Sequence, residues 1–192
     1  MARRIFVFDR PDRFVCGTVG TPGQRTFFLQ AVQGERLVSV QLEKIQVAVL
    51  AQRMGQILAE LQRRGDPAGD LGSPQGDDER PLDEPLHDEF RAQTLTVGWD
   101  VEDARMVVEA RSEIETETET ETEDEEEAVE EIEDSAPDGP DVVRVRLDGE
   151  QVLGFVRRSA RILSAGRPAC PFCGEPLNPE GHICPRKNGY LN

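Results

Sequence analysis

Four residues near the C-terminus have the types and spacing of a metal site. Cys170 and Cys173 form a Cys-x-x-Cys pair, and His182 and Cys184 follow after a short stretch. Structural zinc sites in proteins use four thiolate or imidazole ligands arranged as a tetrahedron. The sequence therefore predicts one Zn²⁺ ion held by three thiolates and one imidazole.

The residues between these ligands suit a zinc knuckle. Pro171 and Gly174 are turn formers that let both sulfurs of the pair face one point, and residues 177–181 can return the chain. The second half, His-x-Cys, is less common than a second Cys-x-x-Cys pair. Four protein ligands leave no position for water, so a structural zinc is favoured over a catalytic one. Free thiols or a disulfide are the weaker alternative.

Basic side chains around this site suggest a second chemistry, contact with phosphates. The candidates lie on the last predicted helix and in the tail: Arg157, Arg158, Arg161, Arg167, Arg186 and Lys187. Arginines beside a zinc knuckle can bind a nucleic acid. Only Phe172 and Tyr190 are near enough to stack on bases, so a solvated helix face is the preferred interpretation.

Few residues of the chain are candidates for acid–base or nucleophilic catalysis. Cys16 lies in an apolar run and is expected to be a small buried residue. His87 has carboxylate neighbours, but its loop setting favours a solvated histidine over a metal ligand. No Gly-rich phosphate loop or nucleophile elbow occurs. A non-enzymatic protein is therefore favoured, and the enzymatic hypothesis rests on a cleft near Trp99, Asp100 and the 65–92 loop.

The elements that must position these residues begin with strands. The first 42 residues alternate apolar runs with turns, which predicts a meander of four strands at 5–8, 14–19, 26–32 and 37–42. A helix is predicted over 43–64 from its apolar face: Val47, Leu50, Met54, Ile57, Leu58 and Leu61. The Gly/Asp/Pro-rich loop at 65–92 follows it.

The second half of the chain predicts a hairpin of strands 94–101 and 105–110, then a strand at 142–147. A second helix is predicted over 150–165, with Val152, Leu153, Val156, Ala160 and Leu163 as its inner face. Strands first and helices late, without repeated βαβ units, predict an α+β fold. We expect a mainly antiparallel sheet with two helices on one face and a zinc-ribbon-like knuckle at the C-terminus.

The net charge of −16 is concentrated in one segment. Residues 113–141 contain 16 of the 38 acidic residues and no Lys or Arg, and the rest of the chain carries 22 of each sign. The repeat TETETETE alternates like a strand, but it offers no apolar face and its charges repel. A disordered acidic insert is therefore predicted.

The length of 192 residues and the 37% apolar content suit one domain and a small module. We expect an α+β domain at 1–165 and a zinc-binding tail at 166–192. No apolar stretch approaches the roughly 20 residues that span a bilayer, and no signal peptide is recognisable. A cytoplasmic protein without a membrane partner is expected, and the sequence does not specify its oligomeric state.

The chain resembles an uncharacterised actinobacterial family of similar length in three stretches: RIFVFDRPDRFVCGTVGTPGQRTFFLQA, GWDVEDARMVVEA and AGRPACPFCGEPLNPEGHICPRKNGY. Its most specific part is the C-terminal CPxCG…GHxCPRxNGY pattern. The resemblance implies a domain of unknown function whose members tend to accompany a histidine-phosphatase-like protein and a kinase-like protein. It supplies no catalytic residues. The Glu-Thr repeat departs from the family pattern and is expected to be dispensable for the fold.

These observations favour a binding or adaptor protein with a structural zinc, whose partner is another protein bound through the sheet edge or the zinc module. Nucleic-acid binding through the arginines is the second hypothesis, and an enzyme of unrecognised type is the third.

Overall fold

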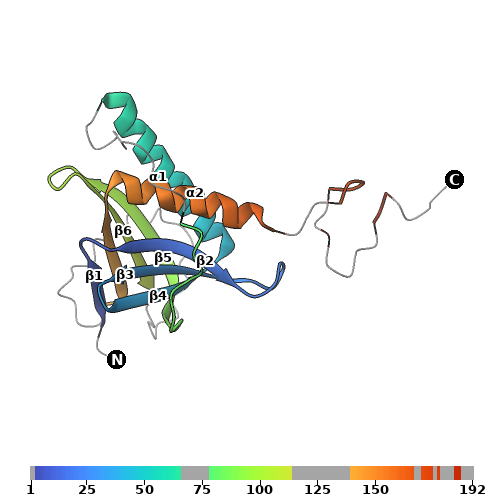
Figure 1. The fold of residues 1–192 in the computed structure, drawn as a ribbon, viewed down its shortest axis with the longest axis horizontal. Coiled ribbons are helices and arrows are strands. Elements are labelled where there is room, and N and C mark those ends of the chain that lie inside the picture. Colours follow the sequence, from blue (N-terminus) through green and yellow to red (C-terminus); the bar gives the residue numbers. More distant parts are fainter. Residues whose placement is uncertain are drawn as a thin grey trace, which may run out of the picture.

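Seven strands and two helices make up the structure, a computed structural model that describes residues 3–65, 78–113, 139–166, 170–174, 177 and 184–186. The strands are β1 (Ile5–Phe8), β2 (Arg13–Val19), β3 (Thr26–Gln33), β4 (Arg36–Leu42), β5 (Asp88–Asp100), β6 (Arg105–Ser112) and β7 (Val142–Leu147). The helices are α1 (Lys44–Arg64) and α2 (Gly149–Ser164). All strands belong to one sheet in the order β1-β7-β6-β5-β4-β3-β2, and both helices cover the same face (Figure 1). The predicted α+β class is confirmed.

The sheet is mixed, which corrects the predicted meander of the first four strands. Strand β1 pairs in parallel with β7, not with β2, and β4 pairs in parallel with β5. The other four pairings are antiparallel. Parallel neighbours need a long crossover connection, and α1 provides it between β4 and β5. Short turns predicted the local hairpins correctly, but they carried no information about a partner as distant in sequence as β7.

The sheet is strongly curled because β1 and β2 lie at opposite edges yet are joined by only residues 9–12. Seven flat strands would separate the edges by about 29 Å. The five Cα steps of the connection cover at most about 19 Å. The β3–β4 turn reaches β1, where the Arg36 guanidinium donates to Val7 O at 3.3 Å, and Asp12 N in the connection extends the β2–β3 pairing by donating to Val32 O at 2.8 Å.

The core fills the space between the concave face of the sheet and the helices. Inward side chains meet across neighbouring strands, as Leu29 does with Val40 and Val108 with Val145. The ring of Phe14 stacks on Phe155 of α2 with centroids 5.0 Å apart. Helix α1 buries the face predicted for it, including Val47, Leu50, Met54, Leu58 and Leu61, with Ile57 partly buried.

Helix α2 presents most of its predicted inner face to the core: Val152 is buried, and Leu153, Val156 and Leu163 are partly buried against the core, whereas Ala160 is exposed. The helix also buries Phe155 and the polar pair Arg158 and Ser159, which the sequence did not predict. The reason lies in β2, an edge strand whose Cys16 carbonyl has no strand partner on that side. The Arg158 guanidinium donates to this carbonyl at 2.6 Å, and Ser159 Oγ lies 3.2 Å from Cys16 Sγ. These contacts with the edge strand explain why the polar side chains of Arg158 and Ser159 lie on the inner side of α2.

Residues 78–86, here named the strap, cross the outer face of β2 and β3. Residues 78–87 form no helix or strand and none of them is buried, as expected for the loop predicted over 65–92, but β5 already begins at Asp88, which corrects the end of that loop; residues 66–77 lie outside the described part of the chain. Gln30 is fully buried, and its amide accepts from Asp83 N at 2.8 Å and donates to Asp83 O at 3.0 Å. Buried polar groups of the sheet are thereby satisfied by the strap.

Two buried arginines fix the other half of the strap. Arg13 donates to the carboxylates of Asp78 and Asp83 at 2.6 and 2.5 Å, and Arg158 donates to the carbonyls of Asp78 and Arg80 at 2.5 and 2.8 Å. Partial burial would raise the pKa of Asp78, but hydrogen bonds from Arg13 and Arg80 hold it well below its usual value. Burial and the neighbouring Arg13 charge lower the pKa of Arg158.

The acidic segment leaves and re-enters the fold at one point. Ser112 N donates to Asp141 O and Asp141 N donates to Ser112 Oγ, both at 2.9 Å. Strands β6 and β7 on either side are antiparallel neighbours. A short turn would therefore suffice to join them. The predicted disorder of the insert concerns residues outside the described part of the chain.

Replacing residues 114–138 by a four-residue Gly-containing turn should preserve the fold. Shortening the loop reduces its closure entropy, so the free energy of unfolding should stay unchanged or rise by about 1 to 2 kcal/mol. Urea denaturation followed by circular dichroism measures this. A Gly/Ser segment of the native length is the matched control, and loss of cooperative unfolding in the shortened chain would show that the segment supports the fold.

Truncating Arg158 to Ala should lower the free energy of unfolding by about 3 kcal/mol, because the buried carbonyl of Cys16 loses its donor and the carbonyls of Asp78 and Arg80 each lose one of two donors. Arg157→Ala, on the exposed side of the same helix, is the control and should change it by less than about 0.5 kcal/mol. Equal effects of the two substitutions in urea titrations would contradict this account.

The charge of Asp78 should stabilise the protein only above acidic pH. Its pKa is depressed in the folded chain, so the stabilisation is complete above the ordinary carboxyl value of 3.8 and is lost as pH falls below it. At pH 7 the free energy of unfolding of the wild type should be higher than that of Asp78→Asn by about 1 to 2 kcal/mol. Chemical denaturation at several pH values should show this difference shrinking below about pH 4; a difference that stays constant to pH 2 would rule the charge out as its source.

Candidate metal centre

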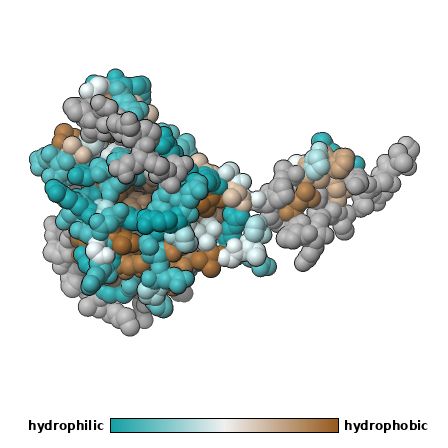
Figure 2. Space-filling model, in the orientation of Figure 1, coloured by the Kyte–Doolittle hydropathy of each residue, from teal (hydrophilic) through white to brown (hydrophobic). Residues whose placement is uncertain are grey.

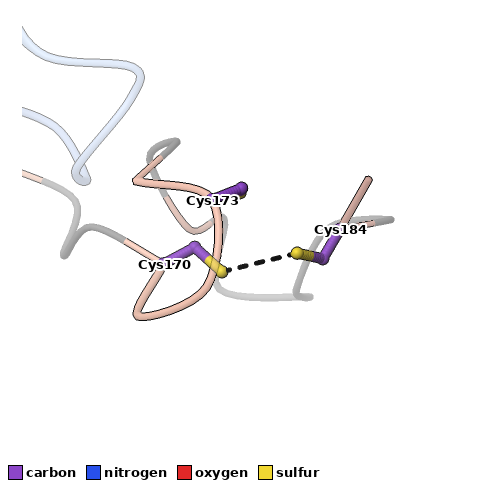
Figure 3. A group of neighbouring side chains, drawn as sticks. All are labelled: Cys170, Cys173 and Cys184. Atoms are coloured by element: carbon purple, nitrogen blue, oxygen red, sulfur yellow. Dashed lines mark hydrogen bonds between the residues drawn. The ribbon is translucent and has the colours of Figure 1, made fainter. Parts of the chain in front are cut away.

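The structure brings three of the four predicted zinc ligands together. The Sγ atoms of Cys170, Cys173 and Cys184 all lie within 4.8 Å of one another. Cys170 and Cys184 are buried and Cys173 is partly buried. Figure 3 shows the side chains of Cys170 and Cys184 pointing toward each other across the tail, with their sulfurs 3.9 Å apart. A cluster of this kind can hold a metal ion.

The spacing of the sulfurs fits a tetrahedral metal site. Zinc–sulfur bonds of about 2.3 Å place two thiolates of a tetrahedron about 3.8 Å apart, close to the separation of Cys170 and Cys184. A disulfide would require about 2.05 Å. All of the chain's cysteines are free thiols in this arrangement, so the alternative of a disulfide in the tail finds no support in the geometry.

The backbone of the first knuckle is built as its sequence suggested. Gly174 N donates to Cys170 O at 2.9 Å and closes the turn. Gly174 has φ of 79°, a conformation that glycine adopts without strain. The second half of the tail is tied to the first by Arg186, whose guanidinium donates to Phe172 O at 3.1 Å. The ligand cluster therefore joins two separate stretches of the tail.

Backbone amides adjust the Cys170 thiol toward the form that binds metals. The N–H of Cys173 lowers its pKa most, desolvation opposes this, and the N–H of Phe172 adds to the lowering. The thiolate is the species that ligates a metal. The lowered pKa of the Cys170 thiol and the spacing of the sulfurs are thus both compatible with metal binding.

The fourth predicted ligand, His182, lies outside the described residues, as do Arg167 and Lys187. The other predicted phosphate contacts are scattered and differ in environment. Arg158 is buried and donates to carbonyls inside the protein, in contrast to the solvated helix face expected from the sequence. Arg161 donates to Glu79 and to Asp78 O, Arg157 is exposed, and Arg186 bonds within the tail.

The other residues considered as catalytic candidates from the sequence lie in the core, on the surface or in a turn. Cys16 is fully buried in the core, and burial raises the pKa of its thiol. His87 is exposed, and Trp99 packs against the core. Asp100 Oδ1 accepts from the backbone N–H of Glu102 and Asp103, which closes the β5–β6 turn. Sequence reasoning missed the cluster of Arg13, Gln30 and the strap, since no motif marks a charged residue at the start of an apolar strand.

Within the residues that the structure describes, no helix is long and apolar enough to cross a membrane.

Comparison with known proteins identifies a family without assigning an activity. The family described as "Protein of unknown function (DUF3090)" matches residues 6–184, from strand β1 to the last cysteine of the cluster. No curated protein and no solved structure matches the chain. The match covers the curled sheet, both helices and the cysteine cluster, and the chain therefore belongs to this family of proteins of unknown function.

Proposed function

We propose that the protein is a binding module whose C-terminal tail is organised by one structural Zn²⁺ ion. The observation that carries this proposal is the approach of three thiols from two separate stretches of the tail to within 4.8 Å. His182 is the proposed fourth ligand, because it lies two residues before Cys184 and is the only histidine in the tail. Three thiolates and one imidazole form a set that zinc prefers.

A structural role follows from the ligand count. Four protein ligands would complete the tetrahedron and leave no coordination position for a substrate or an activated water. Few apolar side chains are available in the tail, so metal binding would supply most of its folding free energy. The ion would then fix the surface that the tail offers to a partner, including the residue Phe172, which is 52% exposed.

Freshly purified protein should contain one equivalent of zinc by elemental analysis. Cys184→Ser and His182→Ala should each lose most of it, because three ligands bind zinc far more weakly than four. Cys16→Ala is the matched control, since Cys16 lies in the core and away from the cluster, and it should keep the full equivalent. Less than about half an equivalent in the wild type, or full retention by Cys184→Ser, would refute the site.

A further inference from the structure

The strap is held on the sheet in the way that a binding groove holds a peptide. Side chains of the folded domain contact its backbone at four residues: Arg158 at the carbonyls of Asp78 and Arg80, Arg13 at the carbonyl of Pro81, and Gln30 at both backbone groups of Asp83. We propose that this groove, formed by β2, β3 and α2, binds an acidic, leucine-containing peptide segment of a partner protein. The strap occupies it in cis and gives the chemistry of the ligand.

Acidic residues are required of any ligand that replaces the strap. Arg13 and Arg158 are each only 6% exposed and lie close enough for the charge of one to lower the pKa of the other. A buried guanidinium left without a partner is strongly unfavourable. Asp78 and Asp83 meet this need in cis, so a ligand in trans must bring carboxylates to the same positions.

The groove also has a seat for one leucine. Leu82 lies directly over Gly17 of β2, with its Cγ only 2.5 Å from the position that a Cβ on Gly17 would occupy. A residue with a side chain at position 17 would have to push the leucine away. Because Gly17 has no side chain, the edge strand leaves a space at this position, and the leucine of the ligand fills it.

The strap leaves part of this groove unfilled. A hollow of about 320 Å³ remains between the strap, the end of β2 and α2, with Val19, Leu86 and Ile162 on its apolar side. Val19 is 50% exposed. A ligand with a larger apolar residue next to its leucine would bury this surface in addition to making the strap's contacts, and would therefore compete with it. The visible side of the molecule is mainly hydrophilic, with apolar side chains gathered in small patches (Figure 2).

This inference rests on the binding-module part of the proposed function and is independent of the zinc site. The strap is attached mainly by hydrogen bonds and ion pairs, and Glu79, Pro81 and Glu84 within it are exposed. Segments with few buried apolar contacts open at a lower free energy than the core. A failure of the peptide experiment would leave the zinc measurement unaffected, and a missing zinc would leave the groove unchanged.

The test uses full-length protein and a fluorescent peptide with the sequence of residues 78–86, DERPLDEPL, followed by anisotropy. Leu82→Ser removes the cis leucine from its seat, so this variant should bind the peptide about tenfold more tightly than wild type. Adding Gly17→Val to Leu82→Ser blocks the seat and should abolish the gain. An acidic peptide without leucine, TETETETED from residues 116–124, should bind neither protein.

Three results would overturn the proposal. The first is a folded Leu82→Ser variant that binds DERPLDEPL no better than wild type, and the second is equal binding of both peptides, which would reduce recognition to charge alone. The third is failure of Leu82→Ser to fold, since a displaceable strap cannot be essential to the core. Hydrogen exchange on wild type gives an independent check: the amide of Asp83 should exchange faster than those of β3, and equal rates would also refute the idea.

Discussion

The short connection between β1 and β2 constrains the whole domain. Four residues must link the two edges of a seven-stranded sheet, so the sheet has to curl until those edges approach each other. The curl creates one concave face deep enough for a core, and both helices cover this face. It also places the β3–β4 turn against β1, where the Arg36 side chain lies over the ring of Phe8 at 4.8 Å.

Curling has a consequence for the convex side near β2. Strand β2 keeps one unpaired edge, and the outer faces of β2 and β3 carry the buried polar residues Arg13 and Gln30. Natural sheets protect such edges by covering or charging them. Here Arg158 donates a hydrogen bond to the edge carbonyl of Cys16, and the strap provides partners for the polar side chains of the outer face. Both Arg158 and Arg13 pair with Asp78, where the two sets of contacts meet. The structural solution to an open edge and the proposed peptide groove are the same set of contacts.

The tail follows a different logic. It has too few apolar residues for a core of its own, and its described residues are joined by contacts between thiols, a backbone amide and Arg186. A ligand cluster can be encoded almost entirely by local spacing, since a Cys-x-x-Cys turn fixes two sulfurs without help from the rest of the fold. This is why the cysteines were identified from the sequence, whereas the environment of the neighbouring arginines was not.

The sequence by itself determined the number and place of most elements, the α+β class, the buried face of α1 and the convergence of Cys170, Cys173 and Cys184. Each of these depends on periodicity or spacing within a few residues. Only the tertiary structure decided the pairing of β1 with β7, the parallel β4–β5 pair, the inward turn of Arg158 and the docking of the strap. Those features join residues that are far apart in the chain. They depend on which backbone groups the curled sheet leaves without a hydrogen-bond partner, and local spacing does not reveal those groups.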